Sequence, residues 1–451
     1  MEHIVSIEEM IHSRKVERKE AGETSRGHDQ PVIVSSSEEE NFMKLKEARV
    51  KGMNRWTKKP KIQKDLLLRG HKDFQKYCQP RVISIGPIHH GNPRYRLAEE
   101  YKLTLAANFI DESGKTDKEL YMVIKNNIEQ LRRCFDKEVI HNYNDDALSW
   151  MLFVDGCTTL KFIDSVVDGN VRRFQITMVQ VASVQQDLFL LENQLPYQIL
   201  DDLIKNSNKG EKLKKSVQSF INVHSMTLKT LEKPANKEPA HLLDLLRNRL
   251  LGCTSVSHKN NSYQEDWRRS FGNVQKLKAV GIHLMANEAS CLLNITFTKK
   301  WKFYGGILRL PPITVDDLTG IKFFNLIAYE MDPEFKNDYA VTSYVFFLDS
   351  LIKEAKDVMH LRQAGILRNF LGSDDEVAQV FNEIATDLVP NPEIYKDVRV
   401  ELQRYYHDNK FKIWISQTVF YQAYSGVLLG LTLSLVQMIY TILSYEYQRR
   451  H

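Results

Sequence analysis

Two helical elements are predicted to meet within the segment Asp187-Leu-Phe-Leu-Leu-Glu-Asn-Gln-Leu-Pro-Tyr197, near the middle of this 451-residue chain. Its leucines recur at three- and four-residue steps, as on one face of an α-helix, at Leu188, Leu191 and Leu195. Pro196 cannot continue the hydrogen bonds of a preceding helix, so that helix must stop or kink just before it. Pro196 can instead open a second helix over residues 197–203.

Polar side chains lie beside this break, namely Glu192, Asn193 and Gln194. A break in a helix leaves backbone groups without helical partners, and nearby polar side chains can bond them. We therefore expect these three residues to have a structural role rather than to bind a ligand. By the same reasoning, Gly86-Pro87 predicts a tight turn, with His89 and His90 bonded to neighbouring backbone.

A helical period dominates from about residue 70 to residue 410, which we predict to form one mostly helical domain. Residues 241–251 predict a helix ending at Gly252, Ser373 and Glu376 predict a capping box, and another helix is expected from about residue 342 to residue 359. The alternating segments 293–298 and 307–310 predict a β-hairpin at the edge of a sheet. The fold class is mainly α, with a large multi-helix globular body and a small β-hairpin or sheet.

The first 65 residues are predicted to be a disordered, charged leader, because their charges alternate without a sustained apolar period. Between Lys44 and Lys64 there are nine Lys or Arg residues and one acidic residue. Such a run could contact anionic lipid or RNA, although a solvated linker has the same composition.

The C-terminal region has no charged residue from Ile413 to Tyr445. A helix over residues 423–445 would measure about 34 Å, enough to cross a bilayer core of about 30 Å. We predict a transmembrane helix over residues 421–445, a short tail over residues 446–451, and a cytosolic body. The sequence does not distinguish between the plasma membrane and the endoplasmic reticulum as the membrane that this helix would cross. The alternative is a buried core helix, because several polar residues dilute the apolar run.

Small and polar residues form a stripe along this C-terminal helix at helical steps. Its members are Gly426, Gly430, Ser434, Gln437, Thr441 and Ser444. Small residues let two helices approach closely, and Gln437 could hydrogen-bond across the contact. The stripe predicts a homo- or hetero-oligomer, although Gly is also simply common in membrane helices.

Catalytic signatures are missing from the sequence. The motifs H-E-x-x-H, G-x-S-x-G and G-x-G-x-x-G do not occur, and the five cysteines form no C-x-x-C pair. His89 and His90 are adjacent, which suits a metal poorly because neighbouring side chains point in different directions. Cys157 lies in an apolar stretch, where a cysteine is more often a small buried hydrophobe. We expect no metal and no cofactor, and the net charge of +5 indicates no nucleic-acid partner.

Several ordered blocks resemble the plant family catalogued as domain of unknown function 247. They include Ser84-Ile-Gly-Pro-Ile-His-His-Gly91, the 187–197 segment, and Phe324-Asn-Leu-Ile-Ala-Tyr-Glu330. The residues that we carry over as its motif are Ser84, Gly86, Pro87, His89, His90, Gly91, Glu99, Lys102, Asp155, Gly156, Cys157, Leu191, Glu192, Asn193, Gln194, Pro196, Asn325 and Glu330.

The resemblance implies a mostly helical plant protein, attached to a membrane through its C-terminus and without established enzymatic chemistry. We therefore expect a membrane-anchored, non-catalytic interaction or recognition protein whose protein partner is open. The alternative is a hydrolase-like enzyme with His89 or His90 and Cys157 or Glu192 in one cleft. An enzyme requires these groups within hydrogen-bond reach around an open pocket, and this requirement separates the two hypotheses.

Overall fold

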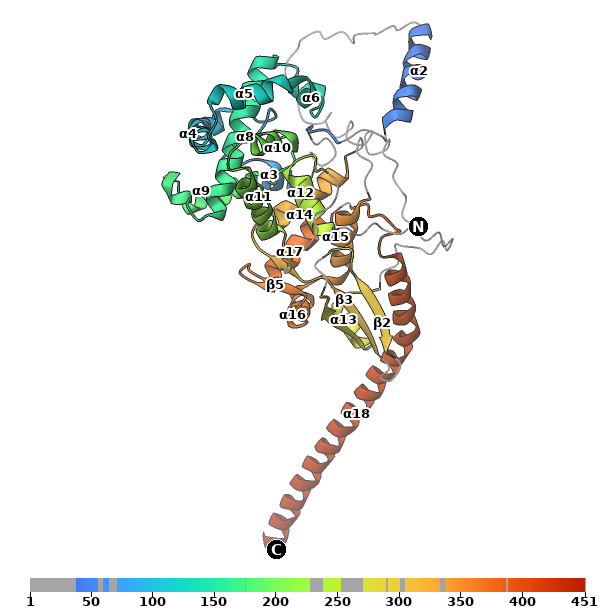
Figure 1. Cartoon of the computed structure of the whole chain (residues 1–451). Coiled ribbons are helices and arrows are strands. Elements are labelled where there is room, and N and C mark those ends of the chain that lie inside the picture. The colour runs from blue at the N-terminus through green and yellow to red at the C-terminus, as the bar shows by residue number, and fades with distance from the viewer. Residues whose placement is uncertain are drawn as a thin grey trace, which may run out of the picture. The chain divides into compact units, whose positions relative to one another are not determined.

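The structure, a computed structural model, describes residues 38–55, 60–64, 71–174, 176–227, 238–252, 271–288, 291–300, 305–332, 338–386 and 388–450. The chain divides into two units, Met1–Arg55 and Trp56–His451. The only described element of the first unit is helix α2 (Glu38–Arg55). All other described elements belong to the second unit (Figure 1).

Part of the predicted leader differs from the expectation of disorder. Helix α2 begins with three glutamates, which favour the positive end of the helix dipole, and Lys44 lies 2.9 Å from the Glu40 carboxylate one turn earlier. Ile62 is buried and pairs with Phe135 as an isolated β-bridge, so residues 60–64 belong to the second unit. The leader residues 1–37 lie outside the described residues.

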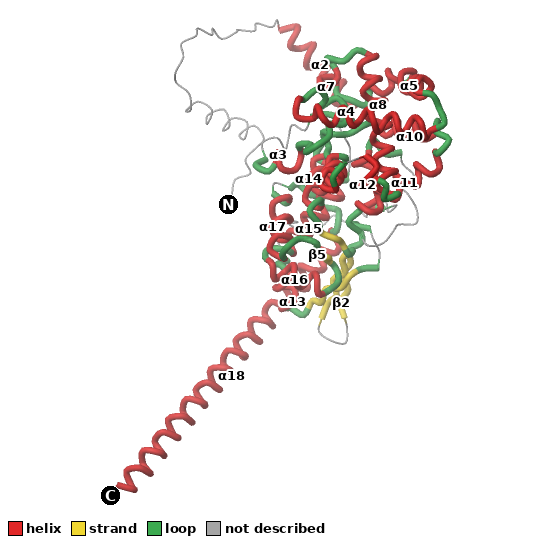
Figure 2. The backbone as a smooth tube through the Cα atoms, turned by 90° about the vertical axis from the view of Figure 1, so that its left-hand side faces the viewer, coloured by secondary structure: helices red, strands yellow, loops and turns green. Residues whose placement is uncertain are grey.

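The first half of the second unit is helical (Figure 2). Its elements are α3 (Phe74–Cys78), η2 (Pro93–Tyr95), α4 (Arg96–Ser113), α5 (Asp117–Asn126), α6 (Ile128–Arg132), α7 (Lys137–Ile140), α8 (Asp145–Val167), η3 (Val171–Phe174), α9 (Met178–Asp187), α10 (Tyr197–Lys205), α11 (Gly210–His224) and α12 (Leu242–Leu251). Helix α8 is the centre, with α4, α5, α10 and α11 packed around it (Figure 1). Gly156 permits the approach of α10, because a Cβ there would lie 2.7 Å from Ile199 Cγ2.

The second half combines helices with two small sheets. Its elements are α13 (Val274–Ala279), β1 (Ile282–Ala286), β2 (Thr296–Lys300), β3 (Gly305–Leu310), β4 (Ile313–Val315), α14 (Thr319–Glu330), α15 (Ala340–Leu351), α16 (Ala355–Gln363), β5 (Leu367–Asn369), α17 (Asp374–Ile384) and α18 (Lys396–Arg450). One sheet has the order β1-β3-β2, and the other pairs β4 with β5 in parallel.

The predicted hairpin is confirmed, with two corrections. Strands β2 and β3 pair antiparallel, with Phe297 opposite Leu308, and β2 lies at the sheet edge. However, Gly305 and Gly306 belong to β3 rather than to a turn, and a Cβ at Gly306 would lie 2.5 Å from the Phe297 ring. The other neighbour of β3 is β1, in parallel, which the sequence pattern did not indicate.

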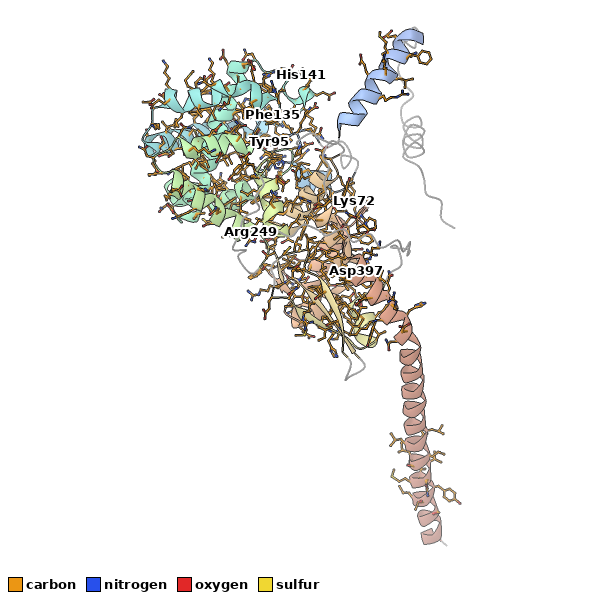
Figure 3. All side chains as sticks on the ribbon, turned by 45° about the vertical axis from the view of Figure 1, so that its right-hand side comes forward. Lys72, Tyr95, Phe135, His141, Arg249 and Asp397 are labelled. Atoms are coloured by element: carbon orange, nitrogen blue, oxygen red, sulfur yellow. The ribbon has the colours of Figure 1, made fainter. Side chains whose placement is uncertain are left out.

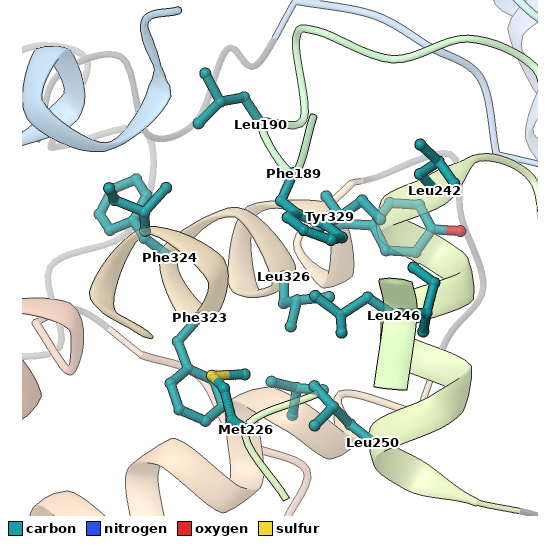
Figure 4. Close-up of a cluster of buried hydrophobic side chains, with 14 of the residues drawn as sticks. Phe189, Leu190, Met226, Leu242, Leu246, Leu250, Phe323, Phe324, Leu326 and Tyr329 are labelled. Carbon is teal, nitrogen blue, oxygen red and sulfur yellow. The ribbon is translucent and has the colours of Figure 1, made fainter. Parts of the chain in front are cut away.

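A single hydrophobic core joins both halves, and side chains fill the second unit throughout (Figure 3). Figure 4 shows Phe189 pointing between α14 and α12, toward Leu326 and Tyr329. Residues 188–195 form turns rather than the expected helical face, because α9 ends at Asp187. Pro196 caps α10 as predicted.

The predicted transmembrane helix over residues 421–445 is wrong. The structure gives one long helix, α18, that also contains the residues assigned to the tail up to Arg450. Its first turns carry charges such as Arg399 and pack beside β2, where Tyr405 contacts the Phe297 ring. Polar residues including Gln437 interrupt its apolar run. Among the helices of the described chain, none combines the length and the apolar character that crossing a bilayer requires.

The contact between α3 and α17 gives a pH-dependent prediction. Glu383 accepts hydrogen bonds from Lys76 Nζ (2.7 Å) and Tyr77 Oη (2.6 Å). Burial acts to raise the pKa of Glu383, but hydrogen bonds from Lys76, Tyr77 and Gln379 outweigh it and lower the pKa to about 2 from its ordinary value of 4.5.

Because the folded chain binds this proton less tightly than the unfolded chain, the ionised Glu383 stabilises the fold above its unfolded pKa. We expect about 1–2 kcal/mol of stability to be lost as the pH falls from about 5 to about 2, allowing for solvent screening at Lys76. Urea unfolding of the native chain and of Glu383→Gln across this range measures the difference. A difference that does not shrink at low pH would exclude this assignment.

Candidate functional site

Several family-motif residues gather around the segment 81–91, which is neither helix nor strand and forms turns from residue 87. Asp187, at the end of α9, accepts hydrogen bonds from the backbone N–H groups of Arg81 (2.8 Å), Val82 (2.8 Å) and Ile83 (3.0 Å). Burial raises the pKa of Asp187 to about 6, although the three N–H groups favour the charged form. Asp187 was not among the expected motif residues, and its position directly before the leucines was the available signal.

The side-chain amide of Asn193 also binds the backbone of this segment, both as an acceptor and as a donor. Its Oδ1 accepts from the Ile85 N–H (2.7 Å), and its Nδ2 donates to the carbonyls of Ile83 (3.2 Å) and Asp187 (2.9 Å). Gln194 Nε2 donates to the carbonyls of Leu188 and Leu190, both at 2.8 Å. Both side chains are buried, and they bond backbone groups freed beyond α9, as a structural role requires.

Gly86 fixes the turn that follows. Its φ of +73° is a left-handed conformation, and a Cβ there would lie 2.6 Å from the Gln194 carbonyl oxygen. The Gly86 N–H donates to Asp155 Oδ2 (2.8 Å) on α8. The adjacent Pro87 carbonyl accepts from Tyr143 Oη (3.4 Å), and Gly91 closes the segment with a φ of +78°. The hydroxyl of Ser84 is buried without a hydrogen-bond partner among the described residues.

Lys102 forms the charged centre of the motif. Its side chain is 0% exposed, and Nζ lies 2.8 Å from Glu99 Oε1 and 2.7 Å from Asp155 Oδ1. Burial acts to lower the pKa of Lys102, but the carboxylates of Asp155 and Glu99 outweigh it and raise the pKa. Thr158 Oγ1 also donates to the Lys102 carbonyl (3.0 Å), so this network locks α4 to α8.

The two histidines face different carboxylates. His89 Nε2 lies 3.6 Å from Glu192 Oε2, and His90 Nδ1 lies 4.0 Å from Glu99 Oε2. His90 thus lies beside a carboxylate of the Lys102 network, whereas His89 faces Glu192, and the two side chains are turned apart as expected for neighbours. Among the described residues, no group of three or more His, Cys, Asp or Glu side chains is placed to hold a metal ion.

Cys157 belongs to the hydrophobic core. Its side chain is fully buried, and burial raises the pKa of the thiol, which favours the neutral form over the nucleophilic thiolate. The cavities bounded by described residues include one of about 740 Å³ beside α4, α8 and α9 and one of about 1530 Å³ beside α6, α10 and α12. The residues expected for an enzyme, His89, His90, Cys157 and Glu192, line neither of them.

The motif residues on α14 join the two halves of the unit. Asn325 Oδ1 accepts from the Leu191 N–H (2.8 Å), and its Nδ2 donates to the Tyr77 carbonyl (2.8 Å). Glu330 accepts from Arg247 Nε (2.7 Å) and from Thr342 Oγ1 (2.7 Å). Both α14 side chains are fully buried. The hydrogen bonds of Asn325 and Glu330 hold separate segments of the chain together.

The expected association stripe lies along α18. The hydroxyls of Ser434, Thr441 and Ser444 donate to carbonyls within this helix, those of Gly430 (2.8 Å), Gln437 (2.7 Å) and Thr441 (3.0 Å). A Cβ at Gly430 would meet no atom within 4 Å. Gly426 also lies in α18, where the structure does not describe its surroundings.

Comparison with known proteins gives a family and no solved structure. The family DUF247, described as plant protein of unknown function, matches residues 62–438. UPF0481 protein At3g47200 of Arabidopsis thaliana is 27% identical over 369 residues, which cover 75% of this chain and 73% of that protein. Putative UPF0481 protein At3g02645 of the same plant is 19% identical over 440 residues, which cover 75% of this chain and 81% of that protein. No solved structure matches.

The match extends from the β-bridge at Ile62 into the C-terminal part of α18 and includes every motif residue described above. It therefore spans most of the 451 residues. The chain belongs to DUF247, a family of plant proteins of unknown function, as the resemblance of its sequence blocks predicted.

Proposed function

We propose that this chain is a non-catalytic interaction protein that associates with a second copy of itself through the C-terminal part of α18. One observation carries the proposal. Nine large apolar side chains of α18 are each more than half exposed: Leu429, Leu431, Leu433, Leu435, Val436, Met438, Ile439, Tyr440 and Ile442. Full burial of a leucine-sized side chain contributes about 1.5–3 kcal/mol, so a surface of this kind favours association.

A second copy fits this surface because the two copies would meet at the stripe. Gly430, Ser434, Gln437 and Thr441 fall within an arc of about 60° on the helix, and the exposed side chains of Leu433, Met438 and Tyr440 flank this arc. The hydroxyls of Ser434 and Thr441 already bond carbonyls of their own helix, so they need no partner across the contact. No charged residue lies between Leu429 and Ser444, so two parallel copies meet no like charges there.

The motif geometry supports a non-catalytic role. Lys102 is held between two carboxylates, Asn193 and Gln194 bond backbone, and Cys157 lies in the core. These groups position chain segments. A general base or nucleophile must instead reach a substrate in an open pocket.

Gly430→Ile is expected to weaken the dimer at least tenfold, corresponding to about 1.4 kcal/mol, because the branched side chain holds the two helices apart. Sedimentation of the full-length chain over a range of concentrations measures the dissociation constant. Thr432→Ile is the matched control, because residue 432 points away from the stripe, about 200° around the helix from residue 430.

Three results decide the matter. Dimerisation that Gly430→Ile weakens and Thr432→Ile spares supports the proposal. A full-length chain that stays monomeric contradicts it, and so does equal weakening by both substitutions, since the second result means that apolar exposure alone drives the association.

A further inference from the structure

We infer that the cavity beside α4, α8 and α9 binds a small amphipathic anion, with an apolar body and a carboxylate or phosphate head. The inference is independent of the association through α18. The cavity has a volume of about 740 Å³, within the range of about 300–1,000 Å³ that small-molecule sites occupy. Its walls come from the segment 81–85, one face of α4, the C-terminal half of α8 and part of α9.

The apolar part of the lining suits a hydrocarbon body. Buried side chains that line the cavity include Ile83, Ile85, Leu105, Phe162 and Leu188. At the surface of α4, Leu97 and Tyr101 also line it, with exposed fractions of 60% and 36%. A small molecule that covers these side chains removes apolar area from water, which favours binding.

The side chains that line the cavity carry a net positive charge, which favours an anionic ligand. Five basic side chains line it, against three acidic ones. Each acidic group is already paired with lysine: Glu112 contacts Lys161 and Lys209, and Lys212 Nζ lies 2.9 Å from Asp164 and 2.6 Å from Asp168. The two remaining cations, Arg81 and Arg94, form no salt bridge with any described residue, although Arg81 acts to lower the pKa of Asp187 and the Arg94 guanidinium lies 5.9 Å from the centre of the Tyr95 ring.

Both arginines are anchored at the same end of the cavity. Tyr95 Oη donates to the Pro80 carbonyl (2.8 Å), which joins the residues next to Arg94 and Arg81. The backbone of Arg81 is held by Asp187, and that of Arg94 by Asn92 Oδ1 (3.0 Å). Two exposed guanidinium groups on anchored backbone, beside an apolar lining, match a head that accepts charge-assisted hydrogen bonds and a body that does not.

Two kinds of charged head group fit this description of the ligand, a free carboxylate and a phosphate ester. Calorimetric titration of the full-length chain with dodecanoate and with dodecyl phosphate, each below its micelle concentration, shows which of the two head groups binds more tightly. Dodecanol lacks the charge, and inorganic phosphate lacks the apolar body. We expect dodecanol and inorganic phosphate each to bind at least tenfold more weakly than the better of the two anions.

Two variants test the position of the site. Arg81→Gln with Arg94→Gln is expected to lower the affinity for the anion at least tenfold without changing that for dodecanol, whereas Arg96→Gln, exposed on α4 outside the cavity, leaves both unchanged. Thr104→Trp fills the cavity from an exposed position and abolishes binding. Its control is Leu103→Trp, also exposed on α4 but not in the lining, which binds as the native chain does.

All four substituted chains carry changes at exposed positions, so their melting temperatures are expected to match that of the native chain. Failure of both anions to bind the native chain would overturn the inference. So would equal affinity for dodecanol, or for inorganic phosphate. Undiminished anion binding by the double arginine variant or by Thr104→Trp would place the anion elsewhere and also overturn it.

Discussion

Lys102→Met is expected to destabilise the folded chain by about 3–5 kcal/mol, because it removes one partner of a buried ionic network. Asp155 would keep its charge in the core with only the Gly86 N–H bonded to it. Glu99, which is 34% exposed, loses less because water reaches it. The midpoint of urea unfolding at neutral pH measures the loss.

The matched control is Lys125→Met. Lys125 also joins two helices, since its Nζ lies 2.8 Å from Asp146 on α8, but both side chains are exposed and little change is expected. Adding Asp155→Leu to Lys102→Met is expected to recover part of the stability, because the uncompensated carboxylate is then gone. A loss below about 1 kcal/mol for Lys102→Met would mean that the carboxylates do not depend on this ammonium group.

Arg247→Met is expected to cost a similar amount, about 3–5 kcal/mol, at the junction of α12, α14 and α15. Glu330 is fully buried and accepts from Arg247 Nε (2.7 Å), while Asp338 pairs with the other side of the guanidinium. Burial acts to lower the pKa of Arg247, but Glu330 and Asp338 outweigh it and raise the pKa. Without the arginine, Glu330 retains the N–H and hydroxyl donors of residues 341 and 342, which carry no charge.

Arg247→Lys tests the geometry of this junction, because it keeps the charge and loses the planar fork, so an intermediate loss is expected. Arg362→Met provides the comparison at the surface. Arg362 pairs with Asp374 (3.0 Å), and the arginine side chain is half-exposed. Its cost should stay within about 1 kcal/mol. Chemical denaturation measures all three, and equal costs for Arg247→Met and Arg362→Met would contradict the distinction between buried and exposed pairs.

Local signals predicted local structure well. Gly252 ends α12 with a φ of +67° and Pro196 opens α10, each at its predicted position. Ser373 caps α17 by accepting from the Glu376 N–H, but the Glu376 carboxylate accepts from the Gly372 N–H, so the predicted capping box is only half formed. These features depend on the backbone preferences of single residues and their immediate neighbours, which the sequence displays directly. The alternation in residues 293–298 predicted β2 for the same reason.

Features that depend on distant residues were not predictable in this way. One local signal was also missed: apolar spacing suggested one helix from residue 342 to residue 359, yet Asp357 accepts from the N–H groups of Lys353 and Glu354 at the start of a separate α16. The pairing of β1 with β3 and the contact of Lys102 with Asp155 join positions far apart in the chain. The predicted membrane span failed because the absence of charges was weighed above polar residues such as Gln437, and no described helix is apolar enough over a sufficient length.

The bond between the Asn325 amide and the Tyr77 carbonyl spans 248 positions of the chain. A ribosome adds about 5–20 residues each second, so Tyr77 is made about 12–50 s before Asn325. During that interval Tyr77, buried in the finished protein, lacks the Phe324 ring on which its own ring stacks. Chaperones that hold apolar segments during translation therefore have a defined window of action at the start of this domain.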